Sequence, residues 1–348
     1  MLLATFSVRR INCRSLAVGV AALSVAFALF CAVAVRADAA FFPAEAIDGP
    51  SSDIEQVGKV DLSYDGGGAV AYTKREGGRT RVFVARLRDG AWGAAEAVDS
   101  GLSGDSSLPA VAAADGGRVA VAFANGGNAY GVIRNDASSV WSAPQVLSQN
   151  SDSSKPVGSV DIESNIKGNG YAAFSIPSGD QYDVRAALLD GGVWTPIDSV
   201  FDADATRKAG TGGGRVRVAV GGDGVGAVAW GETDTGAGID RLYVRKVQLG
   251  RASATAEQLS MNDLEGQPAG NASNVSIAME DDSSFAWAGY LQIFGSGPES
   301  RTRGLTRRMR GTAFDTPVGI DGGAGPGDPA VSAAIDLSGR GHGVTAAA

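Results

Sequence analysis

The chain has 348 residues, of which 50 are glycine, and its net charge is −8 at pH 7. An acidic chain repels nucleic acid and anionic lipid, so we expect neither as a partner. Its apolar fraction of 44% is too high for a disordered protein.

The first 39 residues have the layout of a secretory signal peptide. Arg9, Arg10 and Arg14 form a basic start, an uncharged apolar run spans residues 16–35, and Ala37-Asp38-Ala39 is an A-x-A cleavage signal. A run of this length could also span a bilayer, so an uncleaved membrane anchor remains the alternative. Either way, the sequence predicts a secreted or envelope-associated protein, with no membrane contact beyond this leader.

Both cysteines, Cys13 and Cys31, lie in the leader. The mature chain therefore has no disulfide, no thiol chemistry and no cysteine-ligated metal site. We expect its hydrophobic core alone to hold the fold.

Residues 40–348 repeat a pattern about every 50 residues. Each unit predicts an alternating strand, a glycine-rich turn, a strand ending in an aromatic residue, a third alternating strand and a short fourth strand. The aromatic positions are Tyr72, Phe123, Phe174, Trp230 and Trp287, and a later series is Trp92, Trp141, Trp194 and Phe314. Four antiparallel strands per repeat are typical of one propeller blade. The sequence therefore predicts an all-β, single-domain β-propeller of about six four-stranded blades, five complete and the last incomplete.

The segment FFPAEAIDG at 41–49 resembles WGAAEAVDS at 92–100, with Phe41 in the place of Trp92. It therefore predicts an outermost strand that joins the last blade and closes the ring, which would remove an exposed sheet edge. The last unit, from about residue 329, supplies only two strands. An irregular last blade and a truncated copy of a longer propeller both remain open.

The repeats resemble secreted sialidase-like propellers with BNR or Asp-box repeats. The copy nearest to the box runs from Asp136 to Trp141, with Arg134 and Ser138 where the box has serine and glycine. Residues 62–78 are also similar to the turn-and-strand unit of TolB-like propellers. Sialidase activity would imply three arginines, a tyrosine–glutamate pair and an aspartate. The R-I-P stretch of that family is missing, so none of these roles transfers to a residue here.

Other catalytic motifs are missing from the sequence. The one histidine, His342, lies in the incomplete last unit, and no G-x-S-x-G motif surrounds a serine. One histidine without mature cysteines excludes an ordinary zinc site. The glycines at 210–214 lack the lysine and helix of a phosphate-binding loop, so we expect a connection between blades.

Loops that follow the second strand of each unit are expected on one face, around the central channel. They carry the carboxylates Glu76, Asp180, Glu232, Asp234 and Asp240, near Arg75, Tyr182 and Tyr290. Such carboxylates could cleave a glycosidic bond or bind calcium, although acidic loop residues are more often simply solvated. The fifth unit has the longest of these loops, with the apolar residues Tyr290, Leu291, Ile293 and Phe294. We expect a contact surface there, or packing over the ring face.

The sequence thus favours an exported, non-catalytic monomer that binds a glycan or a protein through loops on one face. The candidate binding residues are Arg75, Tyr182, Glu232, Asp234, Tyr290 and Phe294. No cofactor is expected, with calcium left open. The arginines between 301 and 310 are expected on a solvated outer strand pair, or in contact with a polyanion. The alternative function is a degenerate sialidase-like glycoside hydrolase.

Overall fold

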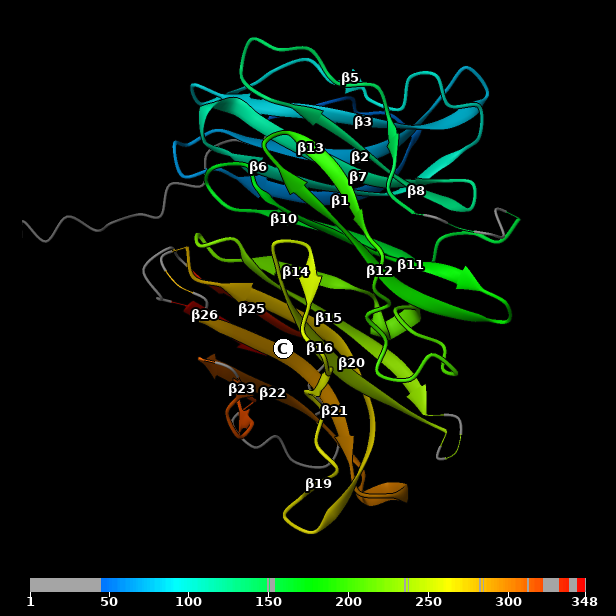
Figure 1. The fold of residues 1–348 in the computed structure, drawn as a ribbon, viewed down its shortest axis with the longest axis vertical. Helices are drawn as coiled ribbons and strands as arrows, with labels where there is room; N and C mark the ends of the chain where they lie inside the picture. Colours follow the sequence, from blue (N-terminus) through cyan, green and yellow to red (C-terminus); the bar gives the residue numbers. More distant parts are fainter. Residues whose placement is uncertain are drawn as a thin grey trace, which may run out of the picture. The chain divides into compact units, whose positions relative to one another are not determined.

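The computed structural model describes residues 45–348, apart from 149, 151–153, 235, 237, 282, 284, 312, 322–331, 338–342 and 348. The leader, Phe41 and His342 therefore lie outside the described residues, and the signal peptide remains a prediction. The chain divides into two units, 1–46 and 47–348. The second unit contains all the strands described below (Figure 1).

Five antiparallel sheets follow one another along this unit. The first contains β1 (Ile54–Leu62), β2 (Gly68–Glu76), β3 (Arg79–Arg88), β4 (Ala91–Trp92) and β5 (Glu96–Ala97). The second contains β6 (Ser106–Ala114), β7 (Arg118–Asn125), β8 (Asn128–Arg134) and β9 (Gln145–Val146). The third contains β10 (Ser159–Ser164), β11 (Gly170–Ser178), β12 (Gln181–Asp190) and β13 (Val193–Ile197).

The fourth sheet contains β14 (Arg217–Val220), β15 (Val225–Asp234), β16 (Ile239–Gln248), β17 (Arg251–Ala252) and β18 (Glu257–Gln258). The fifth contains β19 (Asp263–Leu264), β20 (Gln267–Met279), β21 (Ala286–Phe294), β22 (Arg301–Arg310), β23 (Ala313–Phe314) and β24 (Val318–Gly319). A hairpin of β25 (Ala333–Leu337) and β26 (Gly343–Ala347) follows. In the first, fourth and fifth sheets two short pieces, such as β4 and β5, pair with the same third strand and together form the fourth strand.

The all-β fold from four-stranded antiparallel units is therefore confirmed, and its arrangement is propeller-like. The predicted turns are also confirmed: Gly66 and Gly224 join first to second strands at φ 84° and 78°, where glycine is favoured. The last sheet has two strands in the part of the chain that is described. Closure of the ring by residues 41–48 remains a prediction.

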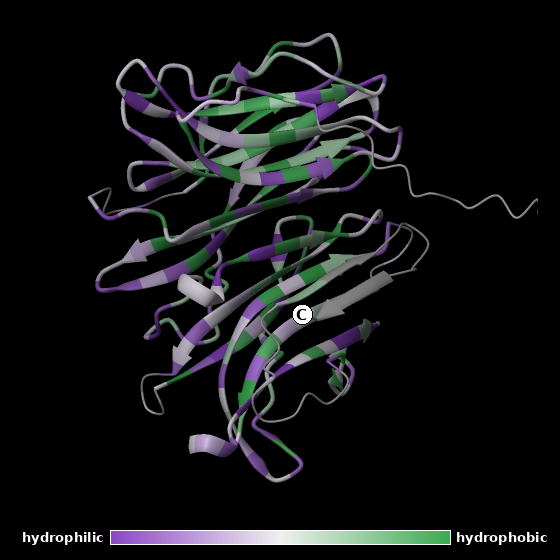
Figure 2. Ribbon diagram, turned by 180° about the vertical axis from the view of Figure 1, so that it is seen from behind, coloured by the Kyte–Doolittle hydropathy of each residue, from purple (hydrophilic) through white to green (hydrophobic). Residues whose placement is uncertain are grey.

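The first long strand of each sheet, which is β20 in the fifth, packs against that of the next, in the order β1, β6, β10, β14, β20 and β25. These are called the first strands below. A separate apolar cluster lies between each consecutive pair of the five sheets. Val84 and Val121 belong to the cluster between the first two sheets, for example, and both are fully buried. Figure 2 shows hydrophobic residues along the strands of the stacked sheets and more hydrophilic residues in the connecting loops. Small Ala and Val side chains on both faces of a strand suit this stacking, because the second, third and fourth sheets are each covered on two sides.

The repeated aromatic residues occupy one register position in each sheet. Tyr72 pairs with Phe83, Phe123 with Tyr130, and Trp230 with Tyr243, and the rings of each pair stack with centroids 5.9–6.3 Å apart. Such cross-strand aromatic pairs stabilise a sheet.

The fifth sheet corrects one sequence assignment. Trp287 was predicted as its repeated aromatic residue, but it pairs with Ala278 and Arg308 near the start of β21 and is half-buried. The residue at the repeated position is Tyr290, which pairs with Leu305 as Trp230 pairs with Tyr243. The string S-F-A-W, which ends at Trp287, was misleading, because an additional A-G-Y follows it before the register position is reached.

Candidate functional site

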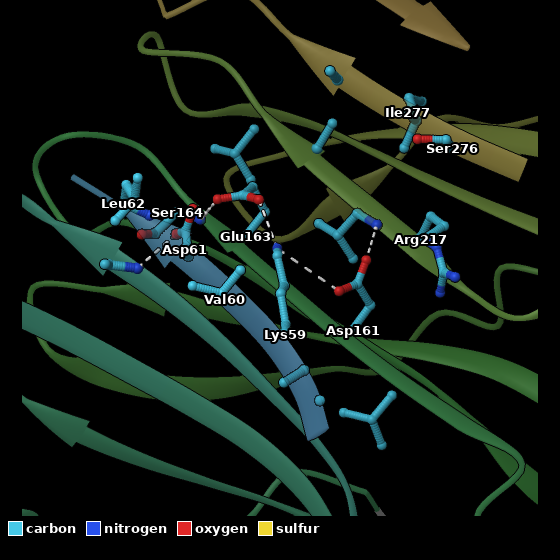
Figure 3. Close-up of a pocket in the computed structure, with 18 of the residues that line it drawn as sticks. Lys59, Val60, Asp61, Leu62, Asp161, Glu163, Ser164, Arg217, Ser276 and Ile277 are labelled. Carbon is cyan, nitrogen blue, oxygen red and sulfur yellow. Dashed lines mark hydrogen bonds and ion pairs between the residues drawn. The ribbon is translucent and has the colours of Figure 1, made fainter. Parts of the chain in front are cut away.

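A cavity of about 990 Å³ lies among the first strands of the five complete sheets. Residues of β1, β6, β10, β14 and β20 line it, so it corresponds to the centre around which the blades are expected to be arranged. Figure 3 shows part of its lining, with Lys59 extending from β1 toward two carboxylates of β10. This cavity is the candidate site.

Lys59 is the centre of a charged cluster in the cavity. Its Nζ donates to Glu163 Oε2 at 2.7 Å and to the Ile162 carbonyl at 2.6 Å, and it lies 3.8 Å from Asp161 Oδ1. The ammonium therefore connects the first strand of the first sheet to that of the third. Its side chain is 27% exposed, so the cluster is in contact with the cavity.

Three carboxylates share this single ammonium. Burial raises the pKa of Glu163 to about 7, and Asp61 and Asp161 add to the rise, although Lys59 opposes it. Burial by itself would lower the pKa of Lys59, but the charges of Glu163, Asp161 and Asp61 raise it above its ordinary value. Lys59 therefore stays protonated, and near neutral pH Glu163 exchanges between its charged and neutral forms.

Two of these carboxylates also connect neighbouring sheets. Asp61 Oδ2 accepts the Ala113 N–H of β6 at 2.7 Å, and Asp161 Oδ2 accepts the Val218 N–H of β14 at 2.9 Å. Asp61 and Asp161 occupy equivalent places on their strands, and each bridges to the first strand of the next sheet. Part of their role is therefore to hold sheets together.

The remaining lining adds an aromatic ring and two arginines. Tyr64, just after β1, is 77% exposed and lines the cavity. Arg217, the first residue of β14, and Arg215, two residues before it, line the cavity as well. The cavity thus combines hydrogen-bond acceptors, hydrogen-bond donors and one flat apolar surface.

The six residues predicted from the sequence lie elsewhere, and none of them lines this cavity. Arg75, near the end of β2, is 60% exposed on its side chain and lies 4.0 Å from Glu55. Tyr182 on β12 donates to the Pro156 carbonyl and lies under the ammonium of Lys208.

Glu232 and Asp234 are on β15 rather than in a loop, and Arg207 brings them together. Its guanidinium nitrogens lie 3.8 Å from Glu232 Oε2 and 3.9 Å from Asp234 Oδ2. Glu232 is buried and accepts from the indole of Trp230. Burial raises the pKa of Glu232 despite that hydrogen bond. The backbone of Lys208, next to Arg207, forms an isolated β-bridge with that of Tyr182. Three of the six predicted residues, Tyr182, Glu232 and Asp234, therefore do gather around residues 207–208.

The expected contact surface at Tyr290 and Phe294 is wrong. The segment continues β21 to Phe294 instead of forming a loop, and both side chains are buried, at 0% and 1% exposure. The Tyr290 hydroxyl donates to the Leu259 carbonyl. These residues belong to the core of the fifth sheet, because Tyr290 occupies the repeated aromatic position.

A second charged feature recurs at the outer edge of every complete sheet. One polar side chain just after the fourth strand accepts a backbone N–H of the third strand; we call it the latch residue. The latch residues are Asp99, Ser148, Asp202, Ser260 and Asp321, which accept from Val82, Ala129, Val184, Leu242 and Gly304. The sequence analysis missed them, although each is an aspartate or serine soon after the predicted fourth strand.

The described residues contain no group of three or more His, Cys, Asp or Glu side chains arranged to hold a metal ion. In the same part of the chain no helix is long and apolar enough to cross a bilayer. The calcium site stays a prediction.

No protein-family model matches the chain, and no curated protein matches it. Similar solved structures include a protein of unknown function from Dyadobacter fermentans DSM 18053, with 11% identity and a TM-score of 0.52 over 82% of this chain and 88% of that chain. The NanB sialidase from Streptococcus pneumoniae has 9% identity and a TM-score of 0.49, over 88% and 67% of the two chains. The α-L-arabinofuranosidase PaAbf62A from Podospora anserina has 13% identity and a TM-score of 0.38, over 76% and 94%.

At these identities the likeness concerns the fold alone. A sialidase is among the similar structures, but no sequence family links the chain to it. The chain shares with the Dyadobacter protein the fold described above, an all-β array of four-stranded antiparallel sheets.

Proposed function

We propose that this protein binds a carbohydrate in the cavity between the first strands of its sheets, without cleaving it. The observation that carries the proposal is the composition of the cavity: the exposed ring of Tyr64 lies on the same lining as carboxylates and arginines. A sugar ring has an apolar face that packs on an aromatic ring and hydroxyls that both donate and accept hydrogen bonds. A volume of about 990 Å³ is within the range of small-molecule sites.

The absence of cleavage is inferred from the hydrogen bonds of the carboxylates. Glu163 Oε2 accepts from Lys59, and Asp161 Oδ2 accepts the Val218 N–H. A general acid and a general base must reach the glycosidic oxygen and a water molecule with free oxygens. Carboxylates that already connect strands are better suited to orient hydroxyl groups.

A glycan is favoured over a protein ligand because the charged groups lie inside a cavity. The loops predicted to form the contact surface contribute no residue to its lining. Arg75 and Tyr182 remain available for a separate loop-based site, and the experiment below distinguishes the two locations.

The test is calorimetric titration of the purified protein with a panel of oligosaccharides, in wild type, Tyr64→Ala and Tyr182→Ala. We expect Tyr64→Ala to weaken binding about tenfold, because an aromatic contact contributes about 1 kcal/mol or somewhat more. Tyr182→Ala is the matched control and should bind as wild type does. Loss of binding in Tyr182→Ala alone would place the site on the loops and contradict the proposal.

Glycoside hydrolysis is the second candidate, favoured by one observation. Glu163 has a pKa of about 7, which suits a general acid, and Asp161 lies near the same ammonium. The same titration mixtures, kept and analysed for released sugars, decide between the two. We expect no release; release that Glu163→Gln abolishes would establish the hydrolase instead.

A further inference from the structure

Two arginines in the cavity have no carboxylate partner in the described part of the chain. Other arginines do bind a carboxylate within 4 Å, as Arg81 binds Asp99 and Arg303 binds Asp321. Arg217 donates only to the carbonyl of its neighbour Val216, and Arg215 has no hydrogen bond or ion pair in the part of the chain that is described. Both line the cavity.

The backbone that carries these arginines is held in place. Ser159 Oγ accepts the Val216 N–H, and Asp161 Oδ2 accepts the Val218 N–H. Val216 and Val218 are buried, at 0% and 3% exposure, on the face toward the third sheet. Arg217, the first residue of β14, lies on the opposite face, because side chains alternate along a strand, and Arg215 precedes the strand by two residues. One short segment, whose backbone is hydrogen-bonded to β10, therefore carries both arginines.

The three carboxylates of the Lys59 cluster leave these two charges unpaired. Asp61, Asp161 and Glu163 are bound to Lys59 or to backbone N–H groups, and none forms an ion pair with Arg215 or Arg217. In Figure 3, Arg217 lies on the β14 side of Asp161, with Lys59 on the other side. A guanidinium offers a planar set of N–H donors that matches a carboxylate or a sulfate, and two of them prefer an anion over a hydroxyl.

From this arrangement we infer that the cavity selects anionic carbohydrates, with the acidic group on Arg215 and Arg217. The inference rests on the proposed carbohydrate site and names its ligand class. Carboxylate oxygens of the Lys59 cluster would accept from the hydroxyls of the same sugar, and Tyr64 would pack against its ring. The chain as a whole is acidic, with a net charge of −8, so a preference for anions has to come from these local groups.

The experiment compares trisaccharides that differ only in the acidic group. Galacturonate and mannuronate trimers, their carboxyl-reduced neutral counterparts and sulfated counterparts are titrated into the purified protein at low ionic strength. We expect the acidic form of at least one pair to bind tenfold or more tightly than its neutral form. The advantage should shrink as salt is added, because exposed charges are screened. Comparing the affinities of the carboxylated and the sulfated trimers identifies which anion the arginines prefer.

The matched variants are the double substitution Arg215→Gln with Arg217→Gln and, as a control, Arg310→Gln at the exposed end of β22. The double variant should bind acidic and neutral trimers equally, whereas the control should keep the preference. Thermal melts establish that each variant is folded. Equal binding of acidic and neutral trimers by the wild-type protein, or a preference that survives in the double variant, would overturn the inference while the carbohydrate site stands. Binding of neither form of any trimer would overturn both proposals.

Discussion

The latch residues of the first and third sheets occupy the same place but have opposite electrostatic surroundings. In the first sheet Asp99 binds Arg81 Nε at 3.0 Å, the Val82 N–H and the Ser106 hydroxyl, so the carboxylate is fully paired. In the third sheet Asp202 accepts the Val184 N–H at 2.6 Å, but its second oxygen is buried without a partner in the described residues.

One residue contributes to the difference. The residue immediately before the one that donates this N–H is Arg81 in the first sheet and Arg303 in the fifth, and both bind their latch aspartate. The third sheet has Asp183 there. Burial raises the pKa of Asp202 to about 8, and the charges of Asp183 and Glu232 add to the rise. The latch aspartate thus accepts the same backbone N–H in both sheets, but it is paired with an arginine in the first sheet and has a raised pKa in the third.

The effect on stability has a definite sign. The pKa of Asp202 is higher in the folded protein than the ordinary 3.8, so between about pH 4 and pH 8 the folded state binds more protons than the unfolded state. The free energy of unfolding therefore falls as the pH rises through this window. Glu163, with a pKa of about 7, adds a fall between about pH 4.5 and pH 7.

The largest effect is expected for Asp99→Ala. The substitution leaves the Arg81 guanidinium and the Val82 N–H without their buried partner, although Arg81 keeps Glu76. We expect the free energy of unfolding in urea to fall by about 3 kcal/mol. Asp180→Ala, at a fully exposed carboxylate, is the control and should change it by less than about 0.5 kcal/mol. A loss at Asp99 no larger than that of the control would show that the latch does not stabilise the sheet.

Asp202→Asn should have the next largest effect, and its sign depends on pH. Asparagine keeps an oxygen for the Val184 N–H but cannot ionise. The quantity to compare is the free energy of unfolding of the variant minus that of the wild type. We expect this difference to be about 3 kcal/mol larger at pH 8 than at pH 4, as measured by urea unfolding at both values. Glu163→Gln, measured in parallel, separates the contribution of the central cluster. A wild-type pH profile that Asp202→Asn leaves unchanged would mean that Asp202 is ionised in the folded protein.

The smallest effect is expected for Asp183→Asn. Removing this neighbouring charge lowers the pKa of Asp202, but it also removes the 3.2 Å ion pair between Asp183 and Arg185. We expect a change of less than about 1 kcal/mol at pH 8, with a shallower dependence of stability on pH. The same urea titrations measure it. A steeper dependence would contradict the assignment of Asp183 as one cause of the shift.

The sequence predicted the repeat, the four strands of each unit and the turns because these depend on short-range patterns. Alternating apolar residues and glycine turns are visible in a single unit. The fifth unit was misread for the same reason. Its aromatic pattern matched at Trp287, but the pairing of β21 with β22 places Tyr290 at the repeated position.

The candidate site was not predicted, because it depends on contacts between distant repeats. Lys59 and Glu163 are 104 residues apart, and neither belongs to a recognisable motif. Functional residues are common in loops, which favoured the loop candidates, whereas the central cavity is lined mainly by strands. The sequence shows that Arg215 and Arg217 are two residues apart, but not that neither has a carboxylate partner among the described residues.

By itself, the sequence determined the all-β class and the four-stranded repeat, because local propensity and patterning of period two are sufficient for both. Only the tertiary structure decided which charges are paired. Asp99 and Asp202 look alike in the sequence, as each follows a fourth strand. Their charged neighbours differ because the third strand brings Arg81 to Asp99 and Asp183 to Asp202, and electrostatic energy depends on those distances rather than on position in the chain.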